Sequence, residues 1–133
     1  MKYVLDTNII TAVLKENQGL IQKIRNNIQN GKIIFINAIA YYEIKRGLLA
    51  VNASEKLRKF EAICNAFDII FLDNISILDI ASDIYSNLKK SGNLIEDADI
   101  LIASMVMHYD YILVSDDSHF NRIQNIQLEN WLN

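Results

Sequence analysis

Hydrophobic residues follow two alternating patterns along the chain. Short runs rich in isoleucine and valine predict buried β-strands, and longer stretches with apolar residues three or four positions apart predict amphipathic helices. The expected strands are residues 2–5, 33–36, 68–72, 111–114 and 126–128. The expected helices are residues 8–15, 20–28, 38–51, 55–67, 77–88 and 96–109. This alternation favours an α/β fold: a three-layer α/β/α sandwich whose mostly parallel sheet has about five strands, with helices on both faces.

Polar residues and glycine mark several of the expected helix ends. Asn37 and Ser54 stand just before helical stretches, where side chains that accept backbone N–H groups are favoured, so we expect both to be N-caps. Gly31 suits the end of the second helix. The chain has no proline and no internal repeat or linker. These features predict one domain over residues 1–133.

Length and composition agree with a globular domain. Of the 133 residues, 51% are hydrophobic and 22% are charged, which is typical of a chain that buries a core. The longest run without a charged residue, 33–42, is about half as long as a bilayer-spanning helix. We therefore expect no membrane segment.

The first residues and the single cysteine predict a cytoplasmic protein. MKYVLD contains no basic leader followed by a long apolar run. Cys64 has no partner for a disulfide within the chain, and its spacing places it on the buried side of a helix.

Seven of the 16 acidic residues fall at positions that meet at one edge of the predicted sheet. In a parallel sheet, strand ends and helix starts share an edge, where ligands usually bind. One acid follows the first strand and two follow the fourth. Three more lie in the first turn of helix 96–109, and one lies roughly 9 Å into helix 38–51. They are Asp6, Asp116, Asp117, Glu96, Asp97, Asp99 and Glu43.

This concentration of carboxylates predicts a divalent cation. Two carboxylates about 5 Å apart repel each other by roughly 3 kcal/mol at an effective dielectric constant of about 20, and a bound cation removes that cost. Oxygen ligands select Mg²⁺ or Mn²⁺ over zinc. Such sites activate water for in-line displacement at phosphorus. Because the net charge is −3, a nucleic-acid substrate needs the metal or a local basic patch to hold it.

Four other side chains near these acids are candidates for supporting roles. Thr7 and Asn8 directly follow the first acid and bring two more oxygen-bearing side chains, so we expect both to support it. Lys45 and Arg46 lie less than a helical turn beyond Glu43 and are candidates for contacts with substrate phosphates.

Three further residues are not expected to take part in the chemistry. Asp97 is on a different face of its helix from Asp99 and resembles a cap. Asp73 follows a strand alone and is typical of a turn. His119 lies in a loop near the acids, where we expect a local hydrogen-bonding role.

Five short motifs together resemble the PIN-domain family over essentially the whole chain, and within it the VapC-type toxins of bacterial toxin–antitoxin modules. They are LDTNII at 5–10, YYEIKRGL at 41–48, IEDADILIAS at 95–104, LVSDDSHF at 113–120 and LENW at 128–131. Each motif alone is weak, but four acidic motifs in this order and spacing are specific.

The resemblance implies a set of catalytic and metal-binding acids. The family's metal-binding acids fall on Asp6, Glu43, Asp99 and Asp117, and Asn8 matches the asparagine that supports the first acid.

Two positions depart from the usual family pattern. The family often has Thr-x-Asn or Thr-x-Asp where this chain has Ser115, Asp116 and Asp117, so the serine keeps the hydroxyl. Either aspartate is a candidate for the fourth acid, and Asp117 is favoured. Position 96 is frequently glycine in such toxins, whereas Glu96 adds an extra acid here.

The resemblance also implies an activity and partners. Proteins of this kind are Mg²⁺- or Mn²⁺-dependent endoribonucleases that cleave structured RNA, often transfer RNA, with activated water and leave a 5′-phosphate. They are typically homodimers that an antitoxin silences by laying its C-terminal segment over the active site.

Three alternative functions share some of these features. A haloacid-dehalogenase-like phosphatase with Asp6 as nucleophile needs a second aspartate at position 8 and a lysine before the late acids, but this chain has Asn8 and no lysine between Lys90 and Arg122. A response-regulator receiver needs a paired acid after the first strand, which is also missing. A non-cleaving PIN-like regulator of nucleic acid remains open.

Overall fold

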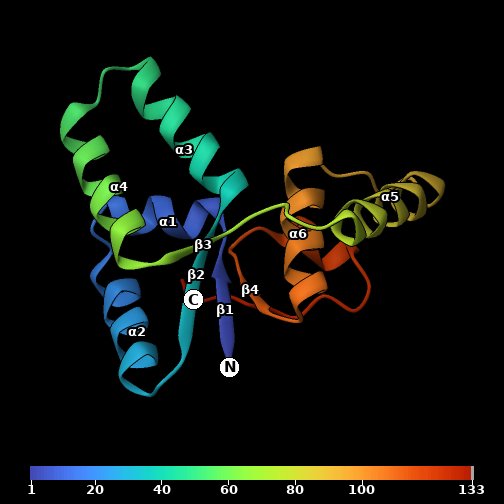
Figure 1. The fold of residues 1–133 in the computed structure, drawn as a ribbon, viewed down its shortest axis with the longest axis horizontal. Coiled ribbons are helices and arrows are strands. Elements are labelled where there is room, and N and C mark those ends of the chain that lie inside the picture. The colour runs from blue at the N-terminus through green and yellow to red at the C-terminus, as the bar shows by residue number, and fades with distance from the viewer. Residues whose placement is uncertain (133) are drawn as a thin grey trace.

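The computed structural model describes residues 1–132, which form a five-stranded sheet flanked by helices (Figure 1). The strands are β1 (Lys2–Leu5), β2 (Ile33–Asn37), β3 (Asp68–Ile70), β4 (Ile112–Val114) and β5 (Leu128–Glu129). Every pairing is parallel, in the order β3-β2-β1-β4-β5. The predicted fold class is confirmed. The order also differs from the 2-1-3-4-5 of receiver domains, which excludes that alternative.

Four strands differ from the sequence prediction: β2 ends one residue later and β4 begins one residue later, whereas β3 and β5 differ more. β3 ends at Ile70, opposite the last residue of β2, so Phe71 and Leu72 continue as exposed, unpaired chain. β5 covers Leu128–Glu129 instead of 126–128, because its pairing with β4 begins there.

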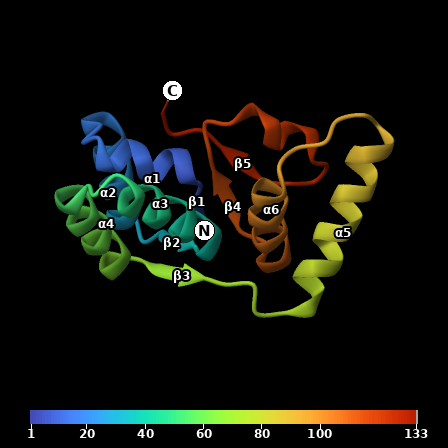
Figure 2. The ribbon, with the colours of Figure 1, turned by 90° about the horizontal axis from the view of Figure 1, so that it is seen from above.

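Six helices of residues 1–132 lie close to their predicted positions. They are α1 (Thr7–Leu14), α2 (Gln18–Gln29), α3 (Ala38–Ala50), α4 (Ser54–Ala66), α5 (Ile75–Lys90) and α6 (Asp97–Tyr109). A short 3₁₀ helix, η1 (Ser118–Arg122), was not predicted. Helices α1 to α4 cover one face of the sheet, and α5 and α6 cover the other (Figure 2). In this part of the chain no helix is both long and apolar enough to cross a bilayer.

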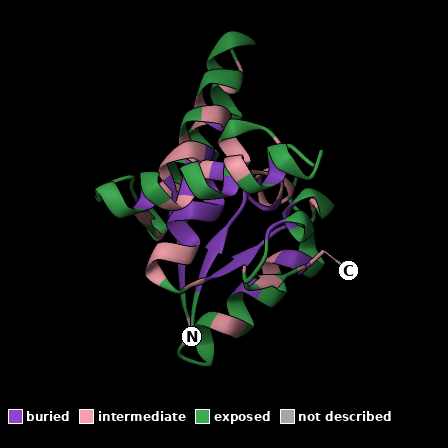
Figure 3. Cartoon of the chain, turned by 90° about the vertical axis from the view of Figure 1, so that its right-hand side faces the viewer, coloured by how far each residue is buried: buried purple, intermediate pink, exposed green. Residues whose placement is uncertain are grey.

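Strand residues alternate between two hydrophobic cores. In β1, Tyr3 and Leu5 pack with the core under α1 to α4, whereas Val4 packs with the core under α5 and α6. Figure 3 shows the strands as a buried layer between exposed helix surfaces. Burial on both faces explains why the strands are continuous apolar runs and not alternating ones.

Asn37 joins the end of β1 to the start of α3, which confirms its predicted role as an N-cap. Its Oδ1 accepts from the backbone N–H of Ala40 at 2.8 Å, and its Nδ2 donates to the carbonyl of Leu5 at 3.0 Å. Asn37 is fully buried. This one side chain therefore fixes α3 relative to the strand end that carries Asp6.

The N-cap prediction at Ser54 is wrong. Ser54 is the first residue inside α4, and Ala53 occupies the cap position without a side-chain hydrogen bond. Asn52, at φ 52°, turns the chain just before this point and so moves the cap off the serine. Cys64 on α4 is partly buried against the core under α1 to α4, as expected.

Candidate active site

Asp6 lies directly after β1, at the centre of the sheet edge. Its backbone N–H donates to the carbonyl of Val114 at the end of β4, 2.9 Å away, and its side chain is only 4% exposed. Burial raises the pKa of this carboxyl, with smaller upward contributions from the charges of Asp117 and Glu43. Hydrogen bonds from the Ser115 hydroxyl and the Thr7 backbone oppose the rise. A buried carboxylate facing other acids is a costly arrangement that a cation relieves.

Ser115 connects the first acid to the last acidic motif. Its hydroxyl donates to Oδ2 of Asp6 at 2.7 Å and accepts from the backbone N–H of Asp117 at 3.0 Å. The hydroxyl at position 115 therefore orients both Asp6 and the loop that carries Asp117.

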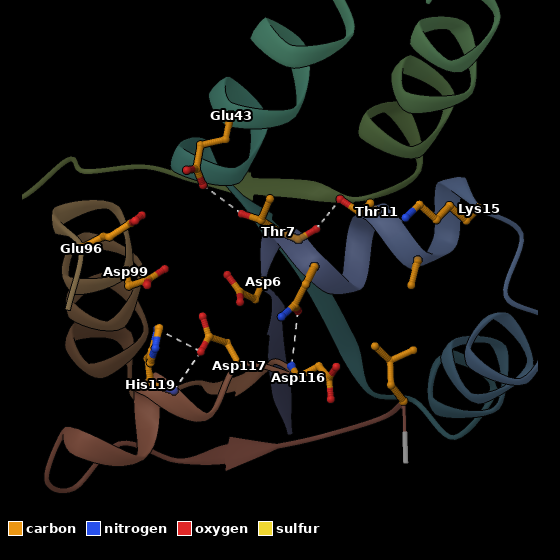
Figure 4. A pocket seen from close by; sticks show the side chains of 13 residues that line it. Asp6, Thr7, Thr11, Lys15, Glu43, Glu96, Asp99, Asp116, Asp117 and His119 are labelled. Carbon is orange, nitrogen blue, oxygen red and sulfur yellow. Dashed lines mark hydrogen bonds and ion pairs between the residues drawn. The ribbon is translucent and has the colours of Figure 1, made fainter.

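Asp99 lies in the first turn of α6 and faces the same cavity as Asp6. Its pKa is raised to about 6, mainly by burial and then by the charges of other acids. In order of effect, those acids are Asp6, Asp117, Glu96 and Glu43. The structure therefore brings together all four acids that the sequence assigned to the metal, from four separate segments (Figure 4).

Glu43 reaches this group from the second turn of α3. Its Oε1 accepts a hydrogen bond from the hydroxyl of Thr7 at 3.1 Å. Thr7 thus orients Glu43 with its side chain and contacts Asp6 through its backbone, which corrects the expectation that its hydroxyl supports the first acid.

Asn8 also differs from its expected role. Its Oδ1 accepts from the backbone N–H of Asp116 at 3.3 Å, so it holds the loop after β4 instead of the carboxylate of Asp6. The side chain of Asp116 accepts from Asn130 Nδ2 at 2.7 Å. Asp117, not Asp116, is the aspartate whose charge raises the pKa of Asp6. The geometry thus agrees with the preference for Asp117 as the fourth acid.

His119 contacts one of the acids near which the sequence placed it. Its backbone N–H and its Nδ1 lie 2.8 and 3.2 Å from Oδ1 of Asp117. One ligand atom each from Asp99, Asp117 and His119 lie within 4.8 Å of one another. The expected local hydrogen bond is present, and the imidazole also lines the site.

The four acids, with Thr7, Asn8, Asp116 and His119, line an open cavity of about 530 Å³. Its donors are mainly carboxylate oxygens, and Lys15 at the end of α1 is its single lysine among residues 1–132. One lysine cannot neutralise the acids, so the donor set fits a hard divalent cation such as Mg²⁺ or Mn²⁺. Glu96 is exposed at the rim of the cavity.

Lys45 and Arg46 do not line this cavity. Lys45 Nζ donates to the Tyr41 hydroxyl at 3.0 Å, and Arg46 lies over the ring of Tyr42 at 5.0 Å. The charge of Glu61 on α4 also acts on Lys45, which places the lysine on the side of α3 that faces α4. Lys45 points elsewhere because it lies about 200° around the helix from Glu43. Arg46 is on a neighbouring part of the helix surface, but its guanidinium lies over Tyr42.

The sequence prediction missed Lys15 and Asn130. Lys15 reaches the cavity because α1 crosses the edge of the sheet, and Asn130 contacts Asp116 because β5 ends beside the loop after β4. No local sequence signal marked either residue, since both positions depend on packing.

Comparison with known proteins identifies the family. Residues 3–126 match the PIN domain. Ribonuclease VapC2 of Haemophilus influenzae is 31% identical over 140 residues, covering 99% of each chain. Ribonuclease VapC2 of Rickettsia felis is 28% identical over 139 residues, covering 98% of each chain. A chain in the crystal structure of VapBC2 from Rickettsia felis, bound to a DNA fragment from their promoter, superposes with a TM-score of 0.90. That chain is 26% identical, and the match covers 98% of this chain and 99% of that one. This chain therefore belongs to the PIN-domain family, and within it to the VapC ribonucleases.

Proposed function

We propose that the chain is a Mg²⁺- or Mn²⁺-dependent endoribonuclease toxin that hydrolyses phosphodiester bonds in structured RNA, with transfer RNA as the substrate class. The observation that carries this proposal is the convergence of Asp6, Glu43, Asp99 and Asp117 from four segments of the chain. Burial, together with the charges of the neighbouring acids, raises the pKa of Asp99 to about 6. Groups held at such a cost are typical of functional sites.

The same four acids are the residues that we propose hold the cation. When bound, the ion supplies an activated water and neutralises charge that develops on the phosphate. Glu96 and His119 lie beside the four acids in the same cavity, where they can contact water or substrate near the cation. Because its pKa is raised to about 6, Asp99 would release a proton on cation binding at a pH below about 6.

The residues around the acids fix their orientation before substrate arrives. Ser115 holds Asp6, and Thr7 holds Glu43. In the proposed hydrolysis, the water oxygen bonds to phosphorus and the bond from phosphorus to the 3′ oxygen breaks. The 3′ oxygen takes up a proton, so the products are a 5′-phosphate and a 3′-hydroxyl.

The phosphatase alternative receives no support from the site. It needs a carboxylate at position 8, where this chain has Asn8, and the amide oxygen of Asn8 is engaged by the backbone of Asp116. Asp6 also lacks a lysine beside it, since Lys15 is the single lysine that lines the cavity in residues 1–132.

We further propose an antitoxin as the partner, a homodimer as the functional form and the cytoplasm as its location. The support for a partner is the likeness to the VapBC2 structure of Rickettsia felis. Copurification of a small protein with the tagged chain expressed from its own operon tests the partner. A chain that is monomeric at all concentrations in sedimentation would refute the dimer.

The test of the activity is the chemistry of the RNA ends. Purified protein is incubated with an RNA pool in Mg²⁺, in Mn²⁺ or in EDTA, and new ends are mapped by ligation that requires a 5′-phosphate. We expect new 5′-phosphate ends with either metal and none in EDTA. Cleavage that persists in EDTA, or that leaves a 5′-hydroxyl, would contradict the proposed mechanism. A protein that binds RNA but cuts none would favour the non-cleaving regulator.

A further inference from the structure

A second cavity of about 230 Å³ opens between α1 and the α3–α4 pair. We call it the α1–α3 groove. It is lined by Thr7, Thr11, Leu14, Lys15, Glu43, Ile44, Gly47, Leu48 and Lys56. Leu14, Ile44 and Leu48 are its apolar side chains, and lysines stand on two of its sides, one from α1 and one from α4.

The groove is continuous with the acidic cavity. Both are lined by Thr7, Thr11, Lys15 and Glu43. A nuclease that cuts inside an RNA strand must hold the nucleotides beside the scissile bond as well as the bond itself. The groove begins where the acids end, so a strand that leaves the acidic cavity on this side enters it.

Charge favours a polyanion in this groove. Lys15 stands at the junction of the two cavities and Lys56 farther along. Neither forms an ion pair with a carboxylate of residues 1–132, whereas Lys59 on the same helix as Lys56 pairs with Glu16 at 3.2 Å. Two unpaired lysines over an apolar floor suit a phosphate backbone whose bases lie against the floor.

Gly47 keeps the groove open. It lies inside α3, where glycine is less favourable than alanine. Gly31 and Gly92 have positive φ values of 80° and 73° that favour glycine, but Gly47 has no such requirement. A Cβ at position 47 would meet no atom within 4 Å. The backbone and the packing therefore both permit a side chain at position 47. Because glycine has none, this part of the groove stays open.

We propose that the α1–α3 groove is a subsite for single-stranded RNA next to the scissile phosphate. Lys15 and Lys56 contact backbone phosphates, and the apolar floor receives a base. This subsite rests on the proposed ribonuclease function. It would bind the nucleotides beside the scissile bond, which the four acids do not contact.

The experiment measures RNA binding separately from cleavage. Each protein variant is titrated into a short fluorescein-labelled single-stranded RNA in EDTA. No metal is then available for cleavage, and all variants keep the same four acids. The variants are Lys15→Ala with Lys56→Ala, Gly47→Phe and Gly47→Leu. The matched control is Lys59→Ala, for a lysine on the same helix but outside the groove.

We expect the double lysine variant to bind RNA roughly tenfold more weakly and to lower the slope of log affinity against log salt by about 1.4, because two phosphate contacts are lost. Gly47→Phe and Gly47→Leu should weaken binding, and should raise the KM for RNA cleavage in Mn²⁺ more than they lower kcat. Lys59→Ala should bind like the wild type. Thermal melts confirm that each variant is folded, and the lysine variants remain informative if Gly47→Phe unfolds.

Two results would overturn the subsite. In the first, wild type cleaves RNA and all groove variants bind and cleave it equally well, so the ribonuclease function stands without this subsite. In the second, Gly47→Phe keeps RNA binding but no longer copurifies with the coexpressed antitoxin, which would assign the groove to that protein. A wild type that cuts no RNA in either metal would instead remove the proposed function.

Discussion

Replacing Asp99 by asparagine tests whether burial and the neighbouring acids make the Asp99 carboxylate unfavourable in the metal-free protein. The substitution keeps the shape of the side chain and removes its charge. The pKa of Asp99 is raised from 3.8 to about 6 in the folded protein. The full shift corresponds to about 3 kcal/mol at 1.36 kcal/mol per pKa unit, and partial exposure reduces it to about 1–2 kcal/mol.

The direction of the pH dependence follows from the raised pKa. The folded protein binds this proton more tightly than the unfolded chain does, so the associated stability is present below about pH 4 and is lost as pH rises through about 6. Asparagine does not ionise. In EDTA, Asp99→Asn should therefore melt close to the wild type at pH 4 and above it at pH 8, by roughly 4–8 °C.

The assay is a series of thermal melts at pH 4, 6 and 8, in EDTA and in Mn²⁺. Asp97→Asn is the matched control, because Asp97 is an exposed acid in the same first turn and its loss should slightly lower the melting temperature through the helix dipole. Mn²⁺ should raise the melting temperature of the wild type more than that of Asp99→Asn. A variant that melts below the wild type at pH 8 in EDTA, or a difference that does not depend on pH, would refute the reasoning.

Three further predictions concern the framework of the site. Ser115→Ala should lower cleavage by about 10- to 100-fold, because Asp6 loses the hydroxyl that orients it, and Ser115→Thr should restore most of the rate; equal rates for Ser115→Ala and the wild type would contradict this role. Asn37→Ala should reduce the free energy of unfolding in urea by about 2–4 kcal/mol, because a helix cap and a buried partner of the Leu5 carbonyl are lost together; a loss below about 1 kcal/mol would count against it. Gly47→Ala should raise the stability by about 1 kcal/mol in the same assay, and destabilisation would show that position 47 is not open.

The fold and the gathering of acids at one edge of the sheet could be predicted from the sequence because both depend on simple rules. The choice of four acids among the seven came from the resemblance to the PIN-domain family. Alternating apolar runs and helical stretches specify a parallel sheet, and its strand ends share one edge. Asp6, Asp99 and Asp117 lie within a residue or a helical turn of that edge, so their placement followed directly. Asn37 was identified as a cap because the cap is local.

The remaining contacts depend on side-chain direction and on packing between helices. Thr7 and Asn8 are next to Asp6 in the chain, but the first turn of α1 directs their side chains to Glu43 and to the loop after β4. Lys45 follows Glu43 by two positions, and helical rotation sends it to the opposite side of α3. Lys56 enters the groove only through the packing of α4, which no local pattern describes.

Cleavage of RNA by the wild type and by Asp6→Asn, side by side in Mn²⁺, tests the central claim most directly. Asp79→Asn is the control, since Asp79 is an exposed acid on α5, away from the acidic cavity. The acidic site predicts that wild type and Asp79→Asn cut RNA at similar rates and that Asp6→Asn cuts at least about 100-fold more slowly, because a charge that holds the cation is gone. Equal cutting by wild type and Asp6→Asn, or no cutting by the wild type with either ion, would contradict it.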